Sequence, residues 1–357
     1  YNIFFPVDMF ENDADKNEAL EQLAFQLMPL ETNMTDTSVF FLTEGRKILT
    51  AAMITYYHQG MDFPQICKRI ISSSWSTLFS EIDQNGNYEA KQYINSFEGT
   101  NEKNIAGCKQ ACDSALKLFA TNSHVYNAIG REREGKEAFT PEQLENKNIF
   151  VVIQDSKLEL YEPLVHIITA QCMEYFSNRD NNNQHTILMC LDEFASFGHL
   201  EITPALRKLR KKHVRIMVLT QSLADIDLIY GRDERMAMLN NFAYKIVLGC
   251  SDSDTQEYFS RLIGEKEVYR KAVSKNGKQV TNTRTEAKER IVPPAELARL
   301  GRHMILLAEG KYYKLTKNYY FELDLWDRVK KCINNLSRIQ EEDFSEKNTL
   351  SLTDENK

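Results

Sequence analysis

Two short apolar runs separated by one basic helical segment limit the folds open to this chain more than any other feature. The runs are residues 186–191 and 214–219, and residues 200–213 between them are rich in Lys and Arg. Parallel strands need a long crossover connection, usually a helix, and they occur in sheets covered on both faces. The pattern therefore predicts a βαβ unit and an α/β fold.

Polar residues follow both apolar runs at the point where each predicted strand ends. Asp192 and Glu193 follow the first run, and Gln221 follows the second. Because ligands of such sheets bind beyond the carboxyl ends of the strands, we expect these three side chains to face one site.

These residue types suit nucleotide hydrolysis. An Asp at a strand end can hold Mg²⁺ through water, and an adjacent Glu can orient or deprotonate the attacking water. Gln221 could sense the γ-phosphate or its water. Each residue also has a structural alternative: Asp192 and Glu193 could begin a helix, and Gln221 could satisfy backbone groups at the strand end. The residues alone leave both interpretations open.

Six cations lie between the two predicted strands. An arginine that acts on the nucleotide of a neighbouring subunit would come from such a segment. A charge run is more often a solvated helix face, and that alternative stays open. The cluster consists of Arg207, Lys208, Arg210, Lys211, Lys212 and Arg215.

No phosphate-binding loop of the Walker type is recognisable in the sequence. The nearest match is residues 130–136, but Glu137 occupies the position where Ser or Thr would hold Mg²⁺, and no strand precedes the segment. Half of a nucleotide site is thus recognisable. We expect the phosphate loop, if the protein has one, to precede Tyr1.

The remaining pattern extends this unit into a larger domain with a helical insertion. Between residues 58 and 146 strand signals vanish and amphipathic segments dominate. Helices are expected after Asp13 or Asp15, and at residues 38–57, 163–176, 232–239, 253–263 and 326–339; hairpins are expected within 269–291 and 304–316. The predicted sheet consists of strands near Tyr1, Ile149, Ile187, Ile216 and Ile246.

Charge and cysteine content restrict the class of protein. A net charge of −7 over 357 residues argues against a uniformly basic coat, so nucleic acid would need local patches or a lined channel. The seven cysteines lie mostly in apolar or helical segments, as expected of buried, reduced thiols. Cys108 and Cys112 lack the second pair that a zinc site needs. No apolar run approaches the about 18 residues of a membrane span.

One predicted hairpin is basic. The Asn276-Gly277 turn lies between Lys275 and Lys278, with further cations at residues 270, 271 and 284. A basic loop of this kind could grip nucleic-acid phosphates without reading sequence. A solvated surface ribbon is the alternative that we slightly prefer. No basic patch interleaved with aromatic residues marks a stacking platform in the sequence.

Several motifs together resemble one family. They are Leu-Asp-Glu-Phe-Ala-Ser-Phe-Gly at 191–198, Leu-Thr-Gln-Ser-Leu-Ala at 219–224, Ile-Tyr-Gly at 229–231, an aromatic–x–x–x–small–Arg helix start at 41–46, and Pro-Pro-Ala-Glu-Leu at 293–297. In this order they resemble the type IV secretion coupling ATPases, the TraG/TraD-like motors of conjugation. The resemblance covers most of residues 1–323.

The resemblance implies an α/β fold with a RecA-like P-loop NTPase core, a mostly parallel sheet and an interrupting all-α domain. Together with the sequence pattern, it divides the chain into core residues 1–57, the all-α domain 58–146 and core residues 147–323. A terminal helix and a tail, expected to be disordered because the sequence beyond Glu341 is polar, occupy 324–357. ATP and Mg²⁺ are the implied cofactors, bound between the subunits of a homo-hexamer. A fragment without its membrane helices could be a monomer.

The resemblance implies roles for the residues that occupy the matching positions of the family's motifs. Asp192 matches the Mg²⁺-linked acid, Glu193 the catalytic acid and Gln221 the sensor. Arg210, eleven residues before that Gln, matches the arginine that acts between subunits. Arg207 and Lys211 remain alternatives for that role.

The implied function is the cytosolic ATPase portion of a coupling protein at the cytoplasmic face of the bacterial inner membrane. It would recruit relaxase-bound single-stranded DNA, deliver it to the type IV secretion channel and drive transfer by ATP hydrolysis. This fragment itself would be soluble, without a transmembrane segment, and inactive without the phosphate loop. Two alternatives stay open: an inactive scaffold whose all-α domain docks cargo, and a related chromosomal DNA translocase.

Overall fold

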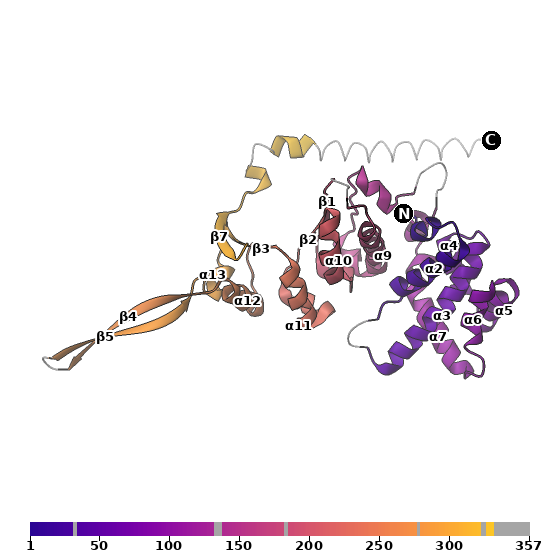
Figure 1. The fold of residues 1–357 in the computed structure, drawn as a ribbon, viewed down its shortest axis with the longest axis horizontal. Coiled ribbons are helices and arrows are strands. Elements are labelled where there is room, and N and C mark those ends of the chain that lie inside the picture. Colours follow the sequence, from indigo (N-terminus) through magenta and orange to yellow (C-terminus); the bar gives the residue numbers. More distant parts are fainter. Residues whose placement is uncertain (31–33, 132–137, 182–184, 277–278, 323–325, 332–357) are drawn as a thin grey trace. The chain divides into compact units, whose positions relative to one another are not determined.

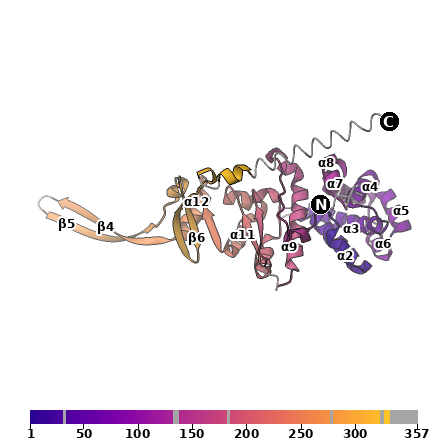
Figure 2. The ribbon, with the colours of Figure 1, turned by 90° about the horizontal axis from the view of Figure 1, so that it is seen from above.

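The computed structural model describes residues 1–30, 34–131, 138–181, 185–276, 279–322 and 326–331 as a mixed α/β chain with more helix than strand (Figures 1 and 2). It divides into two units, Tyr1–Phe242 and Ala243–Lys357. The residues predicted to form the site belong to the first unit, and a long hairpin belongs to the second.

Helices form the amino-terminal part of the first unit. They are α1 (Phe5–Asp8), α2 (Asp13–Leu27), α3 (Asp36–His58), α4 (Phe63–Ser72), α5 (Trp75–Asn85), α6 (Tyr88–Asn95), α7 (Glu102–Thr121) and α8 (Ser123–Ala128). The side chains of Asn12, Thr35 and Asp62 accept backbone hydrogen bonds at the starts of α2, α3 and α4, which satisfies donors that a helix start leaves without partners. Asn12 rather than Asp13 or Asp15 therefore caps the first long helix.

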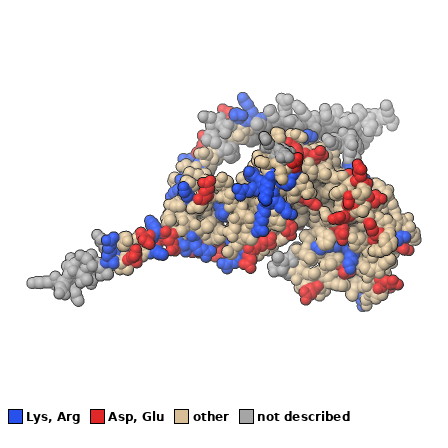
Figure 3. Space-filling view, viewed as in Figure 1, with Lys and Arg blue, Asp and Glu red and all other residues tan. Residues whose placement is uncertain are grey.

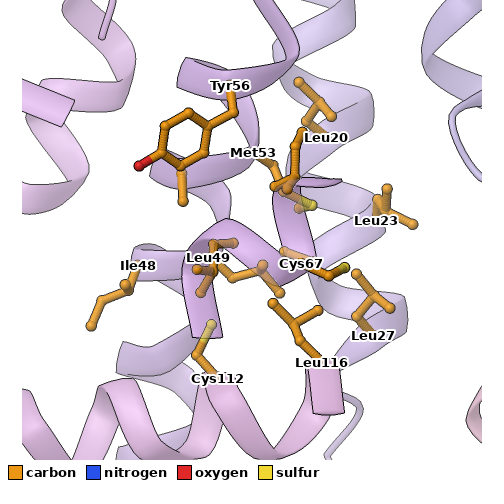
Figure 4. Packing of buried hydrophobic residues seen from close by; sticks show 14 of the residues in the cluster. Leu20, Leu23, Leu27, Ile48, Leu49, Met53, Tyr56, Cys67, Cys112 and Leu116 are labelled. Carbon is orange, nitrogen blue, oxygen red and sulfur yellow. The ribbon is translucent and has the colours of Figure 1, made fainter. Parts of the chain in front are cut away.

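One hydrophobic cluster holds these helices together. Side chains from α2, α3, α4 and α7 meet in it, and Figure 4 shows Leu20, Met53, Cys67 and Leu116 among them. Residues 48–54 of α3 are all buried, which is typical of a helix enclosed by its neighbours. The cluster thus joins residues from both sides of position 58, and the predicted domain limits stay a prediction.

The first seven residues, predicted as a strand, enter this cluster as a turn and a short helix. Ile3, Phe4 and Val7 are fully buried, and Pro6 lies in the first turn of α1. A short apolar run does not distinguish a buried strand from a buried helical segment, and proline suits a helix start better than a sheet interior. The predicted strand was wrong.

The predicted strand at residues 147–153 is also absent. Phe150 and Val152 are 85% and 88% exposed, and none of the described strands pairs with this segment. Strand propensity measures how well side chains fit a half-buried pleated surface. Without a paired neighbour, this β-rich segment has no hydrogen-bond ladder to join.

The predicted βαβ unit is confirmed. Strand β1 (Ile187–Leu191) pairs parallel with β2 (Val214–Val218), and Met189 lies opposite Ile216. Helix α9 (Leu158–Ser177) precedes β1, α10 (Ile202–Leu209) lies between the two strands, and α11 (Leu223–Asn241) follows β2. This part of the chain also contains the 3-10 turns η1 (Pro141–Glu145), η2 (Asp155–Lys157), η3 (Phe194–Phe197) and η4 (Arg210–Lys212). The basic helix is shorter than predicted, and α11 is longer, with a break at Gly231.

The sheet is smaller than the predicted five strands. Among the described residues, β1 and β2 pair only with each other, and β3 (Tyr244–Val247) pairs antiparallel with β6 (His303–Ala308) in the second unit. One face of the β1–β2 pair is also open, since Leu188 is 60% exposed and Cys190 is exposed too. The expectation of buried thiols is wrong for Cys190 and confirmed for the other described cysteines.

The second unit is built on antiparallel strands, and both predicted hairpins are confirmed. β6 pairs with β7 (Lys311–Thr316), and β4 (Glu265–Asn276) pairs with β5 (Gln279–Arg290). Helix α12 (Ser253–Ile263) matches its prediction, and α13 (Pro294–Ala298) and the 3-10 turn η5 (Tyr320–Glu322) complete the unit.

Further predictions concern the helical segments of the chain. Between positions 58 and 146, the described residues contain helices and no strand, as predicted. Residues 326–331 of the predicted helix at 326–339 are helical, and its remainder and the predicted tail lie outside the described residues. Within the ranges given above, the chain has no helix whose length and apolar character would suit a membrane span.

Candidate nucleotide-hydrolysis site

The structure brings three of the predicted site residues together. Asp192 and Glu193 follow β1, Gln221 follows β2, and all three are exposed. The side-chain amide of Gln221 donates a hydrogen bond to Glu193 Oε1 at 3.0 Å. An acidic pair and an amide thus share the carboxyl-end edge of two parallel strands, where ligands of such sheets bind.

Backbone pairing beyond the strands sets this geometry. Leu219 N–H donates to the carbonyl of Leu191, and Phe194 N–H donates to the carbonyl of Leu219, each at 2.9 Å. The loops after β1 and β2 therefore leave the sheet side by side. Ser222 then caps α11 and shares a capping box with Asp225, so that Gln221 is held between a strand and a helix start.

Glu193 has an uncommon backbone conformation. Its φ and ψ are 51° and 52°, in the left-handed region, which costs a residue other than glycine about 1–3 kcal/mol and persists only where the surroundings hold it. Here the carbonyl of Glu193 accepts from Ser196 N–H at 2.8 Å. Its side chain makes no capping hydrogen bond to the turn η3. Glu193 thus precedes the 3-10 turn η3 and takes part in it through its backbone carbonyl, while its side chain does not cap the turn.

Tyr230 of α11 holds the loop that follows the acidic pair. Its ring stacks on that of Phe194, with centroids 5.5 Å apart and planes at 11°. Its hydroxyl accepts from Leu200 N–H at 3.1 Å and donates to the carbonyl of Gly198 at 3.3 Å. Burial raises the pKa of Tyr230, so the hydroxyl keeps the proton that it donates.

Helix α9 holds the other side of this loop. His166 Nδ1 lies 3.3 Å from the carbonyl of Phe197, a distance at which the ring N–H can donate. Burial lowers the pKa of His166, and His199 lowers it further, whereas the bond to Phe197 opposes the change. Gly198 has φ of 69°, and a β-carbon there would overlap the carboxylate of Glu162.

Sequence reasoning missed these supporting residues. His166 lies inside an apolar helical pattern that carries no functional signal, and Tyr230 was noticed only as part of the Ile-Tyr-Gly motif at 229–231. Their role depends on contacts across 30 and 31 positions of sequence, which periodicity does not report.

Arg210 lies at the opposite edge of the two strands. It begins the turn η4 directly before β2, whereas Glu193 and Gln221 follow the carboxyl ends. A strand of five residues is about 16 Å long at about 3.3 Å per residue. The structure therefore does not bring Arg210 to the acidic pair of its own chain.

The cations around Arg210 form an exposed basic patch. Figure 3 shows it as a blue area over α10. Arg207, Lys208, Lys211 and Arg215 are exposed like Arg210, and Arg215 donates to the carbonyl of Arg210 at 3.2 Å. Arg207 lies 3.4 Å from Asn241 Oδ1. The patch agrees with a solvated helix face and leaves Arg210 accessible from outside.

Arg179 fixes the amino ends of both strands. Its guanidinium makes a bidentate ion pair with Glu145 at 2.7 and 2.6 Å, and it donates to the carbonyls of His185 and Lys212 at 2.8 and 2.7 Å. These carbonyls lie two residues before β1 and β2. The side chain of Arg179 is 3% exposed, and the sequence had not singled it out.

The donor set suits Mg²⁺ bound largely through water. Among the described residues there is no group of three or more His, Cys, Asp or Glu that could cage a metal. Magnesium needs no such cage, because it usually keeps several waters and binds one or two carboxylates together with substrate phosphates. Asp192 supplies an exposed carboxylate of the required kind.

Comparison with known proteins decides the family. The family described as "Type IV secretory system Conjugative DNA transfer" matches residues 1–347. The chain belongs to this conjugative DNA transfer family.

Curated relatives of this family member share a limited part of their length with it. The VirD4 proteins of Agrobacterium fabrum (strain C58) and Rhizobium rhizogenes are each 23% identical over 195 residues, which is 53% of this chain and 28% of theirs. The match thus spans little more than a quarter of these relatives.

Solved structures of a coupling protein share the fold of the family member. The conjugative coupling protein TrwBdeltaN70 superimposes with a TM-score of 0.68 at 20% identity, covering 89% of this chain and 72% of that one. TrwB in complex with ADP and Mg²⁺ gives a TM-score of 0.64 at 20% identity, covering 90% and 72%. TrwB in complex with a non-hydrolysable ATP analogue gives 0.68 at 21% identity, covering 89% and 71%.

Proposed function

We propose that this chain is the ATPase portion of a conjugative coupling protein, in which ATP hydrolysis drives single-stranded DNA toward a type IV secretion channel. Family membership supports the conjugative setting. The single observation that carries the ATPase is the hydrogen bond from Gln221 to Glu193 at the carboxyl ends of parallel strands.

The proposal assigns the predicted roles to named side chains. Asp192 would hold Mg²⁺ through water. Glu193 would orient and deprotonate the attacking water, and Gln221 would report whether a γ-phosphate is present. TrwB, which shares the fold, was solved with ADP and Mg²⁺ and with an ATP analogue, which supports the same cofactors here.

The left-handed backbone of Glu193 supports its role as the catalytic base. The strained residue is held by backbone bonds on either side and by the stacked pair of Phe194 and Tyr230. A base that works on a water molecule must be placed before the reaction, because misplacement weakens proton transfer. We infer that the loop at 194–200 maintains this placement.

Arg210 would act on the nucleotide of a neighbouring subunit. Its place at the far edge of the sheet rules out contact with its own acidic pair and leaves it exposed. That arrangement suits a nucleotide held between subunits, and we infer the homo-hexamer with a RecA-like P-loop core from the family. Relaxase and channel proteins would be the further partners, at the cytoplasmic face of the cell membrane, with the helical region around residues 58–146 meeting cargo.

The test is Glu193→Gln in the full-length protein. We expect unchanged ATP binding and a loss of turnover of about 100-fold or more, the usual contribution of a positioned general base. Glu201→Gln, an exposed change of the same kind at the start of α10, should leave turnover unaltered. Hydrolysis that survives in Glu193→Gln would refute the assignment. A wild-type protein that binds ATP without turnover would favour the cargo-docking scaffold.

A further inference from the structure

Helix α11 contacts the candidate site at two points. Its first half, Leu223–Tyr230, follows Gln221 after one capping residue, Ser222, and ends where the helix is broken at Gly231. A capping box closes the first turn, which satisfies backbone donors that a helix start leaves without partners. The segment is thus a short, capped helix that carries Gln221 at one end and the ring of Tyr230 at the other.

An ion pair joins the two halves of α11 across its break. Gly231 has φ of 72° and ψ of 164°, a conformation that glycine adopts at little cost. The guanidinium of Arg235, after the break, donates to Asp227 Oδ1, before it, at 2.6 Å. The side chain of Arg235 is 8% exposed, so water screens this pair little. The pair fixes the direction of the helix at the point where Tyr230 leaves it.

The side chain of Tyr230 reaches the loop after Glu193 with its ring and with its hydroxyl. The ring stacks on that of Phe194, and the two residues are 2% and 0% exposed. The hydroxyl accepts from Leu200 N–H and donates to the carbonyl of Gly198. Tyr230 thus ties both ends of this loop to α11. Phenylalanine in its place would keep the stack and remove both hydrogen bonds.

Phe194 passes this constraint on to Glu193. Its backbone N–H donates to the carbonyl of Leu219 at the end of β2, while its ring lies against Tyr230. The peptide group between Glu193 and Phe194 is planar, so fixing Phe194 at two points restricts the direction of the Glu193 carboxylate. That carboxylate accepts from Gln221. Glu193 and Gln221 are therefore connected twice, by their own hydrogen bond and through α11 and Phe194.

We propose that Tyr230 is a positioning residue of the hydrolysis site, which sets the carboxylate of Glu193 relative to Gln221 through the first half of α11. The inference rests on the proposed ATPase function and deepens it, because it names the residue on which the geometry of the base depends. Misplacement of a reacting group by about 1 Å can reduce a rate by about 100-fold. Tyr230 is 2% exposed and is not itself available to the nucleotide, so its loss acts on turnover and not on affinity.

The test uses the full-length protein and measures turnover per nucleotide site, with the sites titrated by a fluorescent ATP analogue. Tyr230→Leu removes the stack and the hydroxyl, and we expect kcat per site to fall by about 100-fold with KM unchanged. Tyr230→Phe keeps the stack and should retain about a tenth of the wild-type kcat, because a net hydrogen bond contributes up to about tenfold. A purely structural role would lower the number of sites and leave kcat per site unchanged.

A double variant checks that Tyr230 acts through Glu193. In the Glu193→Gln background, Tyr230→Phe should change the remaining turnover by less than about twofold, because effects of residues that act as a unit are not additive. The matched control is Tyr56→Phe, since Tyr56 of α3 is 3% exposed and its hydroxyl donates to Glu81. This control should lower the urea midpoint of unfolding and leave kcat per site unchanged.

The outcomes separate this inference from the ATPase assignment. Wild-type kcat per site in both Tyr230 variants would overturn the inference and leave the ATPase assignment intact. The same fold-loss from Tyr230→Phe in the wild-type and Glu193→Gln backgrounds would also overturn it, because Tyr230 would then act by another route. If Glu193→Gln hydrolyses ATP like the wild type, the ATPase assignment fails, and the role of Tyr230 fails with it.

Discussion

Replacing Arg179 by methionine should lower the free energy of unfolding of the first unit by more than the loss of an ordinary surface ion pair would. The side chain is 3% exposed and connects Glu145 of η1 with the carbonyls that precede β1 and β2. Removing one partner of a buried pair costs about 3–5 kcal/mol, because the other charge stays buried without its counter-ion. Glu145, whose side chain is 17% exposed, would lose the bidentate guanidinium.

Urea unfolding of the first unit, followed by far-UV circular dichroism, measures this cost. With a slope of about 2–3 kcal/mol per M, a loss of about 3–5 kcal/mol lowers the midpoint by roughly 1–2.5 M. Arg69→Ala is the matched control, since Arg69 also holds a glutamate, Glu81, through two nitrogens but is 49% exposed. Exposed pairs contribute at most about 1 kcal/mol.

A double variant separates the charge effect from lost packing. Arg179→Met combined with Glu145→Leu should be more stable than Arg179→Met alone, because no carboxylate then remains in the buried site. If Arg179→Met lowers the midpoint no more than Arg69→Ala does, Arg179 does not hold the two strand starts together, and the reasoning fails.

Two further predictions concern the site. Arg210→Ala in the full-length protein should reduce ATP hydrolysis only where subunits assemble, with the exposed Lys208→Ala as the control; an equal loss in isolated monomers would contradict a role between subunits. Burial lowers the pKa of His166 below its ordinary value of 6.5, so its contribution to stability is fully present above pH 6.5 and is lost as pH falls toward the folded-state pKa, by at most about 1.4 kcal/mol per pH unit. His166→Gln should flatten this part of the urea-midpoint profile between about pH 7.5 and 5.5, and an unchanged profile would show that His166 does not titrate with unfolding.

The sequence pattern predicted the structure correctly where the residues of a segment themselves restrict its conformation. The runs at 186–191 and 214–219, with one helix between them, were predicted as parallel strands, and β1 and β2 are parallel. The Asn276-Gly277 turn predicted the β4–β5 hairpin, because few other residue pairs adopt the backbone that a tight hairpin turn requires. Asp192, Glu193 and Gln221 were placed together because strand direction alone determines which edge they share.

The sequence pattern did not predict which segments pair with each other in a sheet. Residues 1–7 and 147–153 have strand-like composition, yet the first packs among helices and the second has no described strand beside it. The strand near Ile246 exists but pairs with β6 rather than β2. Whether a segment forms a strand depends on a neighbouring strand that supplies hydrogen bonds, and that neighbour can lie anywhere in the chain.

The sequence by itself determined the chemistry that the site can offer: two carboxylates and an amide at strand ends, and a basic segment between them. Only the tertiary structure decided which groups meet. It joins Gln221 to Glu193, places Arg210 at the far edge, and draws Tyr230 and Arg179 into supporting positions. The physical reason is that residue type and strand direction are local properties, whereas burial and hydrogen-bond partners depend on contacts between segments distant in the chain.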